Sequence, residues 1–160
     1  MPHITIEYMI LLPILILQIF LFPLTASWLM NMWTDARRTL ALQEIASHLG
    51  STIQQLYFSL NHETIAAGSV VRRADVPPFI ENYPYIGNAT LTTILDPSLN
   101  SSKVLKITLK LFHTTITADS SVILGENFLW RESVFLSNST NAGIRAEKFM
   151  NGSICLSFES

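Results

Sequence analysis

Charged residues make up only 14 % of this 160-residue sequence, and cysteine occurs once, at position 155. A single cysteine excludes an intrachain disulfide and a cysteine-rich metal site. Because Cys155 stands between Ile154 and Leu156, we expect it to be a small residue of a β-strand. Glycine is also scarce, and the six glycines form no phosphate-binding loop. The composition therefore gives no support to disulfide-rich, metal-cluster or nucleotide-binding classes of protein.

Basic and catalytic clusters are lacking as well. The ten Lys and Arg residues are outnumbered by twelve Asp and Glu residues and are dispersed, so we expect no nucleic-acid partner. The four histidines are far apart in the sequence, and Ser and Thr occur without a nucleophile-elbow context. We therefore assign no catalytic, cofactor-binding or metal-binding residue, and we expect a protein that is not an enzyme.

The most informative absence is local, since no charged residue occurs from Tyr8 to Thr34. A helix needs roughly 20 apolar residues to cross a bilayer, and this apolar segment (residues 8–34) is longer than that. A cleaved secretory signal is the weaker interpretation, because no Lys or Arg precedes the segment and its apolar core is too long. Pro13 and Pro23 each remove a helical hydrogen bond, so we expect bends or local melting there but no helix end.

The apolar segment continues, without Pro or Gly at the junction, into an amphipathic pattern. From residue 36 onward, apolar residues follow the spacings of three and four that define one face of a helix. We therefore expect one helix from about residue 3 to residue 61, with Gly50 as its weak point. Its apolar face has two candidate partners, the chain's own head and other subunits, and both can hold along different portions.

After residue 64 the sequence changes to short β-like runs separated by turn residues. The expected strands are 91–95, 104–117, 122–124, 128–136, 144–150 and 153–158. A change of alternation phase predicts a bulge or bend near Leu111, and Asn151-Gly152 predicts a hairpin, since both residues accept positive φ. The predicted class is α+β: a long N-terminal helix, hydrophobic and then amphipathic, within residues 1–63, and a small antiparallel β-sandwich-like head within residues 64–160.

Four sequons lie in the predicted head, and none precedes it. They match the N-glycosylation pattern at Asn88, Asn100, Asn138 and Asn151, which favours an extracellular head bearing N-linked glycans. Arg37 and Arg38 argue for the opposite orientation, because basic residues tend to stay on the cytoplasmic side of a span. A basic leader removed from in front of residue 1 would resolve this conflict, and we state it as a hypothesis.

The opening Ile4-Thr-Ile-Glu-Tyr-Met-Ile-Leu-Leu-Pro13, the unbroken helix behind it and the β-rich head together resemble the type IV pilin superfamily. The Glu-aromatic opening is similar to its tight-adherence branch, and a glycosylated sandwich head is similar to archaeal pilins and archaellins. The resemblance implies leader cleavage by a prepilin peptidase, passage of the apolar helix from the membrane to a filament core, and heads on the outer surface. Glu7 corresponds to the family's N-terminal glutamate, although it lies slightly deeper.

Two interpretations of Glu7 follow. A carboxylate in a dry filament core needs a partner, such as the amino terminus of a neighbouring subunit. Alternatively, Glu7 flanks the span at the membrane interface.

The predicted function is that of a pilin, a filament subunit for adhesion or surface interaction that polymerises with itself after residing in the membrane. A membrane-anchored surface glycoprotein that does not polymerise and a swimming-filament subunit are the alternatives. The residues predicted to make assembly contacts are Glu7, Ile10, Leu11, Ile14, Leu17, Phe20, Leu21, Leu24, Trp28, Leu42, Ile45, Leu49, Ile53 and Leu56.

Overall fold

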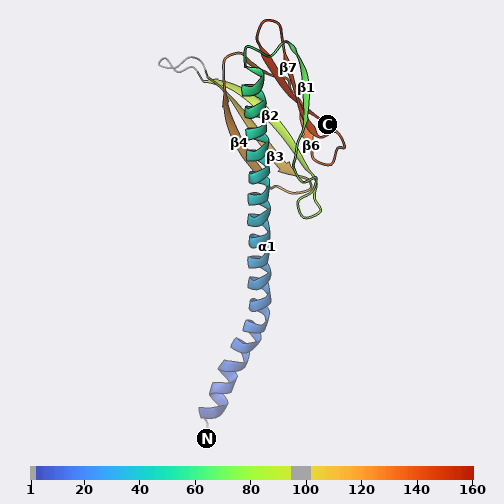
Figure 1. Cartoon of the computed structure of the whole chain (residues 1–160). Coiled ribbons are helices and arrows are strands. Elements are labelled where there is room, and N and C mark those ends of the chain that lie inside the picture. The colour runs from blue at the N-terminus through green and yellow to red at the C-terminus, as the bar shows by residue number, and fades with distance from the viewer. Residues whose placement is uncertain (1–2, 95–101) are drawn as a thin grey trace. The chain divides into compact units, whose positions relative to one another are not determined.

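A computed structural model describes residues 3–94 and 102–160 of the chain. These residues form one helix, α1 (His3–Leu60), followed by eight strands (Figure 1). The chain divides into two compact units, Met1–Arg37 and Arg38–Ser160. The predicted α+β class, with a long N-terminal helix and a small head rich in antiparallel sheet, is confirmed. The unit that contains the head begins at Arg38, so it includes the C-terminal part of α1 as well as all the strands.

Helix α1 continues through both prolines of the apolar segment. Neither Pro13 nor Pro23 ends the helix, as predicted. Further along α1, Gly50 lies in close contact with a strand of the head. A Cβ atom there would lie 2.8 Å from Val122 Cγ2 and 3.3 Å from Ser120 Oγ. The missing side chain therefore lets α1 approach the strand that carries Ser120 and Val122.

The strands of the head form two four-stranded sheets. The first has the order β1 (Gly68–Arg73), β7 (Gly143–Lys148), β8 (Ile154–Glu159), β5 (Phe128–Trp130). The second has the order β4 (Thr117–Leu124), β3 (Ser102–Leu111), β2 (Tyr85–Ile94), β6 (Val134–Leu136). All neighbouring strands pair antiparallel except β5 and β8, which are parallel.

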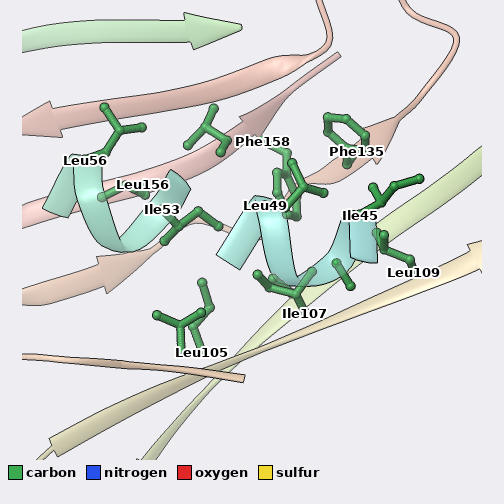
Figure 2. Close-up of a cluster of buried hydrophobic side chains, with 14 of the residues drawn as sticks. Ile45, Leu49, Ile53, Leu56, Leu105, Ile107, Leu109, Phe135, Leu156 and Phe158 are labelled. Carbon is green, nitrogen blue, oxygen red and sulfur yellow. The ribbon is translucent and has the colours of Figure 1, made fainter. Parts of the chain in front are cut away.

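The head core lies between these sheets and is filled by one face of α1. Figure 2 shows the α1 side chains Ile45, Leu49 and Ile53 between Leu156 and Phe158 of β8 and the β3 residues Leu105, Ile107 and Leu109. The strict alternation predicted for β3 is confirmed, since Leu105, Ile107, Leu109 and Leu111 are all fully buried. Each fully buried residue of this kind stabilises the fold by about 1.5–3 kcal/mol. The amphipathic half of α1 is therefore an integral layer of the head.

Two of the predicted strands are each two strands in the structure. The expected run 104–117 contains most of β3 and the first residue of β4, joined by a tight turn in which His113 has a φ of +57°. The phase change near Leu111 marks this reversal of the chain: of the two predicted alternatives the bulge is wrong, and the bend is a full turn between two strands. The expected run 128–136 divides into β5 and β6, which belong to different sheets. Alternation alone does not reveal that a strand leaves one sheet for the other.

Strand β1 was not predicted, and β2 begins earlier than the predicted strand 91–95. All residues of β1 are exposed, so its sequence has no alternation of buried and exposed side chains to detect. The first half of β2 places the small residues Gly87 and Ala89 beside Tyr85 on its buried face, so the sequence there has no repeated large apolar residue to indicate a strand. Gly87 is needed there because a Cβ atom would lie 2.6 Å from Leu109 Cδ2.

The predicted hairpin at Asn151-Gly152 is present between β7 and β8. The Phe149 N–H donates to the Ser153 carbonyl at 2.9 Å, and the Gly152 N–H donates to the Phe149 carbonyl at 3.0 Å. Of the two turn residues, only Gly152 has a positive φ, +82°. The turn is therefore of the longer kind that places one glycine in the left-handed region after a type I turn.

Candidate assembly site

The apolar segment of α1 presents its large side chains to the surroundings. The predicted assembly residues of this segment whose side chains are described are all exposed, from 48 % for Leu21 to 68 % for Leu24. They are Ile10, Leu11, Ile14, Leu17, Phe20, Leu21, Leu24 and Trp28. Glu7 belongs to α1, and its side chain lies outside the described part of the structure.

Exposed apolar side chains occur on every side of this segment. Between the predicted positions stand Leu12, Leu15, Ile16 and Ile19, which are exposed as well. A helix that is apolar all round requires an apolar environment on all sides, such as lipid or several packed helices. A single dimer seam would cover only one stripe of it.

Two threonine hydroxyl groups of the segment bond back to their own helix. Thr25 Oγ1 donates to the carbonyls of Leu21 at 3.0 Å and Phe22 at 2.9 Å, and Thr34 Oγ1 donates to the Met30 carbonyl at 2.9 Å. Because these hydroxyl groups bond within the helix, they need no water and suit an apolar environment.

Small residues leave a shallow hollow on the helix surface. It is open to the surroundings, has a volume of about 370 Å³ and is lined by Phe22, Thr25, Ala26, Trp28 and Leu29. In packed helices, a side chain of one helix inserts between the side chains of its neighbour. This hollow is one place on the segment where such an insertion fits.

Within the described residues, α1 is the one helix that is long and apolar enough to cross a membrane, as judged over its part Met9–Leu60. Its most apolar window has a mean hydropathy of 2.4. These properties are shared by membrane spans and signal sequences.

The remaining predicted assembly residues lie beyond the apolar segment and are not exposed. Leu42, Ile45, Leu49, Ile53 and Leu56 are buried in the core of the chain's own head. Of the two candidate partners of this helix face, the chain's own head and other subunits, the structure shows the face packed against the head. These five residues are covered while the head is folded, so the candidate assembly surface comprises only the apolar segment.

Three sequons have described acceptor residues, and all three asparagines are exposed. Asn88 lies on the outer face of β2, Asn138 lies in the turn after β6, and Asn151 lies in the β7–β8 hairpin. Asn151 Oδ1 accepts hydrogen bonds from the Ser153 backbone N–H at 3.1 Å and from Ser153 Oγ at 2.6 Å. Asn100 lies outside the described residues. The three described sites are thus accessible for modification.

A charged and hydroxyl-rich surface surrounds Asn88 on the outer face of the second sheet. Lys106 Nζ lies 2.7 Å from Asp119 Oδ2, and hydrogen bonds from Lys106 and Thr108 lower the pKa of Asp119. Asp119 is therefore a carboxylate at neutral pH. Its position on β4 could not be related to Lys106 from the sequence, because the strand assigned to residues 104–117 hid the turn between them.

Cys155 lies in β8, as predicted, and is partly buried. Burial raises the pKa of its thiol, Arg131 lowers it and Glu147 raises it. A protonated, partly covered thiol is a weak nucleophile. Over residues 3–94 and 102–160, no three His, Cys, Asp or Glu side chains are grouped as metal ligands.

Comparisons with protein-family models, with curated proteins and with solved structures found no match.

Proposed function

We propose that this chain is a structural subunit of an extracellular, type IV pilus-like filament that polymerises through its apolar segment. The observation that carries the proposal is the apolar segment itself, whose large side chains are exposed on all sides, while the rest of the same helix is locked into a folded head. Outside the bilayer, such a segment is stable only among other apolar helices, and parallel copies of the chain supply them.

The head would then form the outer surface of the filament. Its sequons at Asn88, Asn138 and Asn151 are exposed, which suits N-linked glycans that shield an extracellular surface. Before assembly, the same segment would hold the subunit in the membrane. Adhesion or surface interaction is the activity that fits a displayed head, and a swimming filament would use the same subunit design.

The second candidate is a membrane-anchored surface glycoprotein that remains monomeric. The length and hydropathy of the helix favour it equally, because a single span satisfies the apolar segment with lipid alone.

Electron microscopy of material sheared from the surface of cells expressing the full chain separates the two candidates. Long fibres that contain this chain support the filament. Recovery of the chain only from detergent-solubilised membranes, as a monomer and without fibres, would establish the anchored glycoprotein instead.

A further inference from the structure

Two long edge strands of the head carry charges of opposite sign. Among the described residues, β1 pairs only with β7, and β4 pairs only with β3. All of β1 is exposed, including Arg72 and Arg73, whereas the charged residue of β4 is Asp119. An open edge pairs readily with another strand unless its charges oppose this. Two copies of β1 would repel each other, whereas β4 offers β1 the exposed carboxylate of Asp119, which it shares with Lys106 of its own head.

The two edges also have the directions that pairing between parallel copies requires. β1 begins near the end of α1, where Lys148, the partner of Gly68 in the sheet, donates to the His62 carbonyl at 2.9 Å. β4 ends there too, since Tyr57 Oη donates to Asn127 Oδ1 at 2.5 Å just beyond that strand. The strands thus run in opposite directions. Copies related by rotation and translation along one axis keep their direction, so β1 of one would meet β4 of the next antiparallel.

One register matches both charge and side-chain direction. If Arg73 lies opposite Asp119, Val70 lies opposite Val122. Val70 is the neighbour of the buried Ala146 in β7, and Val122 is buried in β4, so both point to the inner face. Arg73 and Asp119 both point outward. A register that differed by one residue would place inner side chains opposite outer ones.

Space is present beside β4 for the inner side chains of an added strand. A hollow of about 320 Å³ lies between α1 and this strand, and it is lined by Ser47, Ser51, Gln54, Ser120, Ser121, Val122 and Ile123. The serine side chains are small, so this hollow can accept a side chain of the size of Val70.

We propose that β1 of one copy pairs antiparallel with β4 of a neighbouring copy, with Arg73 opposite Asp119. This inference rests on the proposed filament and adds a head-to-head contact to the packing of the apolar segments. In Figure 1, β1 and β4 lie on opposite sides of the α1 portion that packs in the head. One head can therefore use both edges at once, and the contact continues along the assembly without closing.

Disulfide trapping in assembled fibres tests the register. In the full chain with Cys155→Ser, the pair Val71→Cys and Ser121→Cys would face each other between copies at a separation that suits a disulfide. Oxidised fibres should then give a ladder of covalent oligomers on a denaturing gel. Each single variant should stay monomeric, as should the control pair Val71→Cys with Leu129→Cys, whose second cysteine lies on β5.

A charge exchange provides the second test. Arg73→Asp or Asp119→Arg alone should lower the yield of fibres about tenfold, because a cross-strand attraction becomes a repulsion. The double exchange should restore the yield, although Asp119→Arg still removes the partner of Lys106 within each head.

The outcomes separate the two proposals. Fibres with a ladder and a restored double variant support the β1–β4 contact. Fibres without a ladder, or dimers from Val71→Cys alone, overturn this contact and leave the filament intact. A full chain that forms no fibres overturns the filament, and the strand pairing with it.

Discussion

Arg38 Nε donates to Glu81 Oε2 at 2.7 Å. The same guanidinium lies 5.2 Å from the centre of the Tyr83 ring, so an ion pair and a cation–π contact join α1 to the turn at residues 80–83. That turn is closed by two backbone hydrogen bonds of 2.9 Å between Ile80 and Tyr83. Glu81 and Asn82 have φ values of +47° and +70°, which is the geometry of a type I′ turn. The left-handed Glu81 is an unfavourable choice on backbone grounds, and its contact with Arg38 offsets that cost.

Replacement of Arg38 should test how much this contact contributes. The side chains of Arg38 and Glu81 are 20 % and 32 % exposed, whereas those of Lys106 and Asp119 are 52 % and 47 % exposed. Arg38→Ala should therefore lower the free energy of unfolding by about 1 kcal/mol, and Lys106→Ala by less than about 0.5 kcal/mol. Denaturant unfolding of the full chain in detergent measures both, and equal losses would contradict the ranking.

Gly50→Ala should destabilise the head even though alanine favours helix. The new methyl group would collide with Val122 across the α1–β4 contact. Overpacking of this kind costs about 1–3 kcal/mol, whereas the gain in helix propensity is at most about 1 kcal/mol. In a Val122→Ala background the collision is removed, so the same substitution should cost less. A double-mutant cycle measures the difference, and additive effects would show that the two positions do not interact.

The stability of the head should fall in alkali because of Tyr85. Burial raises the pKa of its phenol far above the ordinary 10.0, and the phenol donates to the Pro77 carbonyl at 2.7 Å. Below about pH 10, Tyr85 is protonated in both the folded and unfolded states, so it adds no pH dependence. Above that pH only the unfolded chain releases the proton, and the free energy of unfolding falls by up to about 1.4 kcal/mol per pH unit.

Tyr85→Phe separates the stability that comes from the hydrogen bond to Pro77 from the alkaline loss that comes from the phenol proton. The variant should be less stable than the wild type at neutral pH, because the Pro77 carbonyl loses its donor, but it should lose less stability from about pH 9 to about pH 11. The pKa of Tyr57 is also raised, because burial raises it more than a hydrogen bond with the Gly125 backbone lowers it. Some alkaline loss of stability should therefore persist in the variant. Unfolding curves at several pH values measure the slopes, and identical slopes would refute the role of Tyr85.

A charge in the apolar segment should prevent assembly without unfolding the head. Leu24 and Leu40 are matched, with exposed fractions of 68 % and 70 %, but only Leu24 lies in the apolar segment. Leu24→Lys should abolish fibres, since an unpaired ammonium is strongly disfavoured among apolar helices. Leu40→Lys should leave fibres present. Electron microscopy and head unfolding measure both properties, and abundant fibres from Leu24→Lys would remove this segment from the interface.

Whether Asn88 carries a glycan can be tested with a variant of its sequon and a control variant two residues away. Thr90 and Thr92 are both exposed residues of β2, and only Thr90 belongs to the sequon. If Asn88 carries a glycan, Thr90→Ala should lower the intact mass of the protein by the mass of that glycan, while Thr92→Ala should change it only by the substitution itself. An unmodified Asn88 would give the second result for both variants.

The sequence revealed the helix well because its signals are local and strong. Spacings of three and four, and the lack of charge from Tyr8 to Thr34, defined α1 to within about one residue at its C-terminal end. Alternation likewise revealed the buried face of β3. Both patterns depend only on which side of an element meets the core.

Other features depend on contacts between distant residues, and these were not predictable. The exposed strand β1 has no burial pattern, and β5 and β6 enter different sheets within nine residues, Phe128–Leu136. Which partner covers Leu42 and Leu49 was undecided, because a helix face shows that it is buried but not what buries it. The edge charges Arg73 and Asp119 gained meaning only once the topology placed both strands at sheet edges.

The residues that fill the head core and those of the apolar segment belong to one helix without a break. In the proposed filament, a pull on any head would be transmitted through that backbone directly into the apolar packing, with no flexible linker to stretch first. Because the chain continues from α1 into the strands of the head, detaching a head would require breaking a covalent bond, even if Leu42, Leu49 and Ile53 were first extracted from between the two sheets. Such a fibre should therefore resist mechanical load until whole subunits slide out.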